Sequence, residues 1–146
     1  MENPTLGATD REELVGCLLG LAKVHYDRLI EGTSRLGLTM PQARVLYFVE
    51  SDPTVGKLAK KLDCDASYIT GLVDSLEKAK LLKRQVDADD RRIKRLVLTA
   101  AGRRARQKVA KVIGESFDLD GLVPDEAQQF AQLLRKLQND ERALSW

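Results

Sequence analysis

The sequence is poor in residues that bind metals or form disulfides. It contains one histidine, His25, and two cysteines, Cys17 and Cys64, which lie far apart and form no CxxC motif. A structural zinc site takes four Cys or His ligands, and disulfides are rare inside cells. We therefore expect no metal, no disulfide and no cofactor.

Long apolar runs are absent as well. No stretch approaches the ~20 apolar residues of a membrane-spanning helix. The first residues, MENPTLGATDREE, lack the basic start and the apolar core of a signal peptide. The protein is thus expected in the cytoplasm, without a membrane partner. Its 146 residues suit one domain, 1–146, and its 43% hydrophobic and 32% charged residues are ordinary for an ordered protein.

Charge is unevenly distributed along the chain, although the net charge is only +2. Residues 54–111 hold sixteen Lys or Arg against seven Asp or Glu, whereas the rest of the chain holds eight against fifteen. A basic middle between acidic ends indicates that one region of the protein meets a polyanion.

Two short apolar runs inside the basic region predict a β-hairpin. Residues 81–86 and 93–99 are rich in Leu and Val and flank a tip dense in Asp and Arg. Folding alone gives no reason to gather many cations on one ribbon, whereas nucleic-acid phosphates would neutralise them. The cations of the tip and second strand are Arg91, Arg92, Lys94 and Arg95.

Two helices are predicted at the start of the chain. Apolar residues at helical spacing place the first over residues 10–31, with Asp10 as its cap. Thr39 begins the second helix, with Gln42 completing a capping box, and Asp52-Pro53 ends it.

Two shorter helices then precede the hairpin. Thr54 caps a helix over residues 55–62, and Asp65 caps another from 66 to about 79. Two such helices followed by a basic hairpin form a winged helix-turn-helix, so the fold is expected to be mainly α with a small β wing. The second of these helices would present its N-terminal end to the DNA major groove, where the candidate contacts are Ser67, Tyr68, Thr70 and Gly71.

The two ends of the chain carry apolar stripes that the helix-turn-helix core is too small to cover. We expect residues 10–35 and 117–146 to be dimerisation helices that pair with a second copy. Between them lie the DNA-binding lobe, 36–99, and a connecting helix, 100–116, which Thr99 caps. Pro124 opens the last helix.

The wing carries a motif with fixed spacing. Asp90-Arg91-Arg92 is followed after five residues by Leu98-Thr99, and then by Gly102. This resembles the D-x-R-x5-L-T wing signature of the MarR/SlyA family of transcriptional regulators. Upstream, LTMPQARVL resembles the family's second-helix entry, and LAKKLDCDASYITGLVDSLEKAKLLKR its recognition region. The similarity covers about residues 10 to 144.

The resemblance implies a homodimeric, nucleoid-associated repressor that binds an inverted-repeat operator in double-stranded DNA. Arg92 would enter the minor groove, braced by an ion pair with Asp90. The phosphate backbone would meet Lys57, Arg84 and Arg95.

Three positions depart from the family pattern or from the chemistry of a DNA-binding surface. Lys80 replaces the usual Gly after the recognition helix, and Gly71 replaces a larger polar residue. Asp74 would repel phosphate, so we expect it to be paired or turned aside.

Members of the family also bind small phenolic or aromatic carboxylate ligands between the dimer helices and the DNA-binding lobe. Arg44, His25 and Tyr26 are the candidate lining residues here. Peroxide-sensing relatives carry a reactive cysteine in the first helix, as this chain does at Cys17, so a redox-responsive regulator is the alternative.

Two functions from other classes fit the sequence less well. A winged-helix adaptor that binds only proteins has no reason to keep a basic wing. An enzyme could use the carboxylates of Asp87, Asp89 and Asp90, but they fall on an exposed turn beside four cations, without a nucleophile and base. We assign no catalytic residue.

Overall fold

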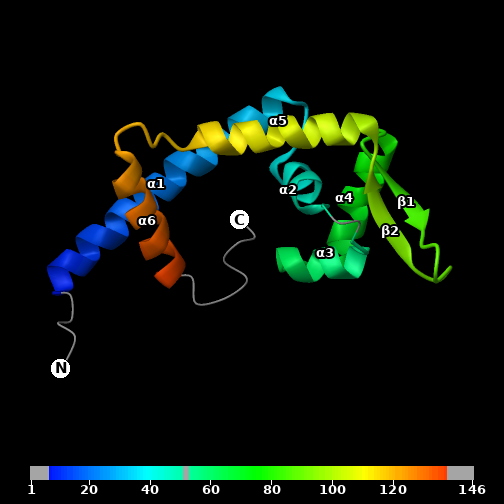
Figure 1. Ribbon diagram of the computed structural model, residues 1–146, viewed down its shortest axis with the longest axis horizontal. Helices are drawn as coiled ribbons and strands as arrows, with labels where there is room; N and C mark the ends of the chain where they lie inside the picture. The colour runs from blue at the N-terminus through cyan, green and yellow to red at the C-terminus, as the bar shows by residue number, and fades with distance from the viewer. Residues whose placement is uncertain (1–6, 51–52, 138–146) are drawn as a thin grey trace.

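The computed structural model describes residues 7–50 and 53–137 of the chain. Helices and strands follow one another in these residues as α1 (Ala8–Arg35), α2 (Met40–Phe48), α3 (Val55–Leu62), α4 (Ala66–Lys78), β1 (Leu82–Val86), β2 (Lys94–Leu98), α5 (Ala100–Ser116) and α6 (Pro124–Leu137). The fold is mainly helical with one small antiparallel sheet, which confirms the predicted class. Helix α1 rises obliquely and its later part passes against α5, the lobe of α2, α3, α4 and the hairpin lies beneath one end of α5, and α6 descends from the other (Figure 1).

Three helices begin at the predicted caps. The Thr39 hydroxyl accepts the N–H of Gln42, whose side chain accepts the N–H of Thr39, so α2 has a complete capping box. The hydroxyls of Thr54 and Thr99 accept the N–H of the third helical residue of α3 and α5. Each hydroxyl satisfies a donor that a helix start would otherwise leave unpaired.

The start of α1 differs from the prediction. Gly7 occupies the N-cap and Asp10 lies within the first turn, so Asp10 is not the cap. An acidic residue in the first turn still favours the helix through the macrodipole. The helix also runs past residue 31 to Arg35, and in this last part Thr33 is buried, with its hydroxyl donating to the Leu29 carbonyl.

Two other helix boundaries differ in detail from the prediction. Helix α4 begins after Asp65 as expected, but the Asp65 side chain makes no capping hydrogen bond. Helix α2 already ends at Phe48, and the predicted stop at Asp52-Pro53 lies partly outside the described residues.

The core of the lobe joins α2, α3, α4, both strands and α5. Its side chains come from the predicted apolar faces, and full burial of such a side chain contributes about 1.5–3 kcal/mol to folding. The largest fully buried ones are Val45, Leu46, Val49, Leu58, Ile69, Val73, Leu76, Leu82, Leu96 and Val109.

The hairpin is tied to its surroundings at its base. Its register pairs Leu82 with Leu98 and Val86 with Lys94. The N–H of Leu96 donates to the carbonyl of Pro53 over 2.8 Å, so the segment before α3 lies against the free edge of β2. The Thr99 hydroxyl donates to the Lys80 carbonyl over 2.8 Å. These hydrogen bonds link the base of the wing to the segment before α3 and to the residue before α5.

Two glycines permit close approaches of α5 to other elements. A Cβ atom on Gly102 would overlap the carbonyl oxygen of Leu81. A Cβ atom on Gly32 of α1 would lie 2.5 Å from a methyl group of Val112 of α5. The first glycine seats the start of α5 on the turn before β1, and the second sets the point where α1 and α5 cross.

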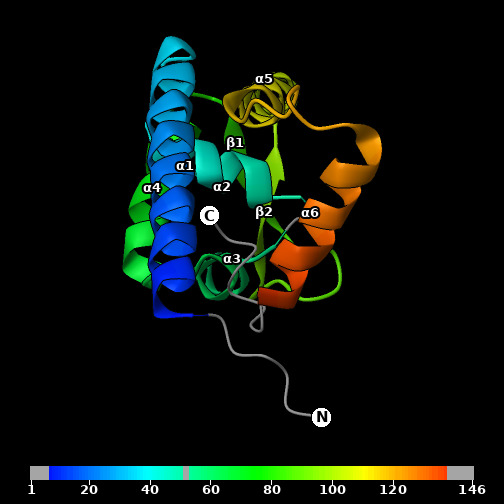
Figure 2. The ribbon, with the colours of Figure 1, turned by 90° about the vertical axis from the view of Figure 1, so that its left-hand side faces the viewer.

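The helices at the two ends leave apolar surface uncovered. None of the side chains of α6 is buried, and Figure 2 shows α6 standing apart from α1 below the end of α5. A hollow of about 410 Å³ between them is lined almost entirely by apolar side chains. The exposed large aliphatic residues of both helices are Leu14, Val15, Leu19, Leu21, Val24, Ile30, Leu133 and Leu137. Within the described residues, no helix is long and apolar enough to cross a membrane.

Candidate nucleic-acid interface

Helices α3 and α4 meet at a tight turn that exposes the start of α4. Asp63 ends α3 with φ +50, a backbone conformation that Asp tolerates better than most residues. Ile69, Val73 and Leu76 then hold one side of α4 in the core. The other side is left outward, as predicted. Ser67, Tyr68 and Gly71 are exposed there, and Thr70 is half-buried.

The wing tip is organised around Asp87. One carboxylate oxygen accepts the backbone N–H groups of Asp89 and Asp90 over 3.0 and 3.2 Å, and the other pairs with the guanidinium of Arg95. The hydrogen bond from Arg95, followed by the two backbone hydrogen bonds, holds the pKa of Asp87 below its ordinary value of 3.8. Asp87 is therefore charged at neutral pH and fixes the turn.

The predicted brace between Asp90 and Arg92 takes a different form. Asp90 accepts the backbone N–H of Arg92 over 2.9 Å, and no ion pair joins its carboxylate to the Arg92 guanidinium in the part of the chain that is described. The ion pair at the tip is Asp87–Arg95 instead, because the strand register brings those two side chains together. Asp90 thus fixes the backbone of the tip.

The predicted wing cations differ in how they are held. Arg91, Arg92 and Lys94 are exposed and make no ion pair within residues 7–50 and 53–137. Arg84 is only 25% exposed and pairs with both Asp74, over 2.8 Å, and Glu77. Asp74 is therefore paired, as expected, and Arg84 joins β1 to α4 with its charge already compensated.

Helix α3 adds further cations to the lobe. Lys57 and Lys60 are exposed, and the ammonium of Lys61 lies 5.1 Å from the centre of the Phe48 ring. Of these three, only Lys57 was predicted as a DNA contact. The other two sit in the same short helix and share the sequence signal of a basic segment.

The residues predicted to line a ligand cleft are not brought together. Arg44 donates to the carbonyl of Leu62 over 3.2 Å. His25 lies 3.0 Å from the hydroxyl of Ser116 and packs edge-on against Phe117. Tyr26 is exposed on α1. The reason is that Arg44 reaches from α2 to the end of α3, whereas His25 and Tyr26 are neighbours on α1 and cannot share a helix face.

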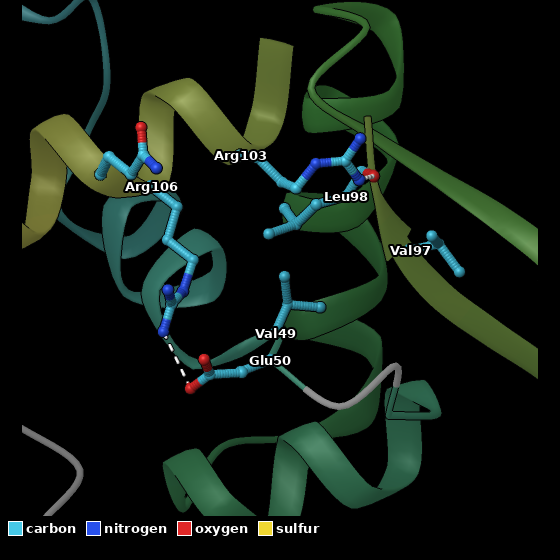
Figure 3. A pocket seen from close by; sticks show the side chains of 7 residues that line it. Val49, Glu50, Val97, Leu98, Arg103 and Arg106 are labelled. Carbon is cyan, nitrogen blue, oxygen red and sulfur yellow. Dashed lines mark hydrogen bonds and ion pairs between the residues drawn. The ribbon is translucent and has the colours of Figure 1, made fainter. Parts of the chain in front are cut away.

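A different hollow lies between α5 and the lobe, with a volume of about 340 Å³ (Figure 3). The guanidinium of Arg106 pairs with Glu50 over 2.9 Å and donates to the carbonyl of Tyr47. Arg103 donates to the carbonyl of Leu98 over 3.0 Å. The apolar part of the lining comes from Val49, Val97 and Leu98. Sequence reasoning missed this site, since the surplus of Arg on 100–116 was its only signal.

Both cysteines of the chain lie in the described residues. Cys17 and Cys64 are free thiols, and Cys17 is exposed on α1. Within the described ranges, no group of three His, Cys, Asp or Glu side chains could hold a metal ion.

Sequence comparison places the lobe in a known group. A sequence model described as "MarR family" matches residues 36–93. YsmB of Bacillus subtilis (strain 168), an uncharacterized HTH-type transcriptional regulator, is 32% identical over 111 residues, which are 73% of this chain and 76% of YsmB. YfiV of the same organism, described in the same words, is 38% identical over 60 residues, 40% of this chain and 38% of YfiV.

Solved structures extend the likeness to nearly the whole chain. A MarR family protein from Bacillus stearothermophilus superimposes with a TM-score of 0.79 at 28% identity, covering 92% of this chain and 96% of that one. A point mutant of S. aureus MepR, bound to an oligodeoxyribonucleotide, shares the fold with a TM-score of 0.62 at 22% identity, covering 85% and 94%. With its exposed helix start beside a basic wing, this chain therefore belongs to the MarR family: it is a DNA-binding transcriptional regulator and not an enzyme.

Proposed function

We propose that the protein is a repressor that binds an inverted-repeat operator as a homodimer and leaves it when a small ligand binds. The observation that carries this proposal is the wing. Arg91, Arg92 and Lys94 are exposed cations beside the open N-terminal end of α4. Such an arrangement suits one duplex, with α4 in the major groove and the wing in the adjacent minor groove. A regulator bound in this way would lie with the nucleoid in the cytoplasm.

Each predicted contact then has a specific role. Arg92 enters the minor groove, and Arg91, Lys94 and Lys57 meet phosphates. Arg95 is partly exposed near the wing tip, where it holds Asp87 while it faces the backbone of the duplex. Arg84 has a structural role, because two carboxylates already neutralise its charge.

Dimerisation is supported by the apolar faces of α1 and α6. Leu19 and Leu133 are 66% and 57% exposed, and several apolar neighbours on the same helices are uncovered as well. Contiguous apolar surface of this kind is covered in stable proteins. A two-fold dimer through these helices would place two copies of α4 about one DNA turn, ~34 Å, apart, as an inverted repeat requires.

The hollow between α5 and the lobe is the best candidate for the releasing ligand. Arg103 and Arg106 provide two cations against one carboxylate, Glu50, so an organic anion with an apolar body matches the lining. A ligand carboxylate would compete with Glu50 for Arg106. That competition would loosen the tie between α2 and α5 and change the position of the lobe.

Selection of duplexes from a randomised pool by the full-length protein tests this proposal. We expect enrichment of palindromic sites, with an affinity that falls linearly in log–log form as salt rises. Repeating the binding with aromatic carboxylates and with peroxide separates the release signals. If peroxide releases the wild-type protein from DNA but does not release a Cys17→Ser variant, the redox alternative replaces the small ligand as the signal. Absence of any enriched duplex would contradict DNA recognition itself.

A further inference from the structure

The helix that faces the major groove carries no cation where bases would be read. From Asp63 to Glu77 the chain has four carboxylates and neither Lys nor Arg. The first cation of α4 is Lys78, about 18 Å from the start of the helix at 1.5 Å per residue. Base contacts come mainly from the N-terminal turns of such a helix. The usual contact to guanine, a guanidinium or ammonium on O6 and N7, is therefore missing from this part of α4.

The side chains present at this end are small or apolar. Tyr68 is 50% exposed, and Ala66 and Gly71 are exposed as well. The hydroxyl hydrogen of Thr70 is committed to the Ala66 carbonyl over 2.7 Å, so this side chain offers a methyl group and an acceptor but no donor. A surface of this composition matches an apolar feature of the groove better than a polar one.

The apolar feature of the major groove is the C5-methyl group of thymine. We propose that Tyr68 and Thr70 determine specificity by packing against thymine methyl groups, so that the operator half-site under α4 is rich in A·T pairs. This inference rests on the proposed function and adds the class of base sequence that α4 recognises.

The wing independently favours the same class of DNA. Arg91 and Arg92 are exposed at its tip, and Asp90 holds the backbone at Arg92. A-tracts have a narrow minor groove with a strongly negative potential, which attracts arginine. Both halves of the interface thus select A·T-rich sequence, one by methyl contact and the other by groove shape.

Replacing thymine with uracil tests the inference, because uracil lacks only the methyl group, which lies in the major groove. The full-length protein is titrated with the enriched duplex from the selection, made with thymine or with uracil at the positions under α4. We expect the uracil duplex to bind more weakly by about fourfold for each contacted methyl group. Equal affinity for the two duplexes, or G·C pairs enriched under α4, overturns the inference and leaves the proposed function standing. If no duplex is enriched, both fail.

Two variants assign the effect to its residues. Thr70→Ser removes the methyl group but keeps the hydroxyl that bonds to Ala66, and Tyr68→Ala removes the ring. Each should lower the ratio of thymine to uracil affinity. Lys111→Ala, at an exposed position on α5, should keep the wild-type ratio. Thermal unfolding shows that each variant is folded. A wild-type ratio in both α4 variants overturns the assignment.

Discussion

At the scale of single residues, the turn after α4 contains a backbone conformation that costs free energy of folding. Lys80 has a φ of +58, a left-handed conformation that costs a non-glycine residue about 1–2 kcal/mol. Its carbonyl is held by the Thr99 hydroxyl, so the turn keeps this shape despite the cost. The family usually has glycine at this position. Here a lysine adopts the left-handed conformation that glycine would adopt without strain.

We predict that Lys80→Gly stabilises the protein by about 1 kcal/mol, reduced in part by the greater freedom of glycine in the unfolded chain. Urea unfolding measures the change. Gly37 offers the reverse control, since its φ of +72 should make Gly37→Ala destabilising although the space around its Cβ position is open. A loss of stability in Lys80→Gly would show that the lysine side chain outweighs the strain.

The charge of Asp87 makes the stability of the fold depend on pH. The pKa of Asp87 is lowered in the folded protein, mainly by the hydrogen bond from Arg95, so its charged form stabilises the fold. That contribution is complete above the unfolded value near 3.8 and is lost as the pH falls through the lower folded value. Asp87→Asn should be less stable than the wild type at pH 7, and the gap should close below pH 3.8. If the difference in unfolding free energy between the two proteins stayed the same over that pH range, the stabilising role of the Asp87 charge would be contradicted.

At the scale of elements, the close packing of α5 against the turn before β1 depends on one glycine. Gly102 lies against the carbonyl of Leu81, and backbone cannot yield to a new Cβ atom as a flexible side chain can. Gly102→Ala should therefore destabilise the protein by about 2–3 kcal/mol and separate the wing from α5.

Gly114→Ala is the matched control on the same helix. The space around its Cβ position is open, so alanine should stabilise α5 by roughly 0.5–1 kcal/mol through its better helix propensity. Thermal and urea unfolding of both variants make the comparison. Equal effects of the two substitutions would mean that the contact with Leu81 is unimportant.

Elements with local signals could be predicted from sequence, and features that depend on tertiary contacts could not. The caps at Thr39, Thr54 and Thr99 were predictable because each involves residues only three positions apart. The partner of Asp87 was not, because it depends on how β1 and β2 are registered. The Glu50–Arg106 pair joins residues that only the packing of α2 on α5 brings together.

At the scale of the whole molecule, the uncovered faces of α1 and α6 predict how the protein assembles. Leu133→Glu places a charge within the apolar face of α6 and should convert a dimer into monomers, with weaker operator binding. Gln128→Glu adds the same charge at an exposed polar position of the same helix and should leave the assembly unchanged. Sedimentation measures both. A wild-type protein that sediments as a monomer at micromolar concentration would contradict the dimer.

The crossing of α1 and α5 at Gly32 and Val112 also has a mechanical consequence. Val112 lies about 18 Å from the wing end of α5 at Ala100 and about 6 Å from the other end at Ser116, at 1.5 Å per residue. A rigid helix that pivots at this point is a lever with arms in a ratio of about three to one. A displacement of about 1 Å beside His25 would then reach the wing as about 3 Å in the opposite direction, so the crossing would set the gain between the end of the molecule that carries α6 and the end that carries the wing.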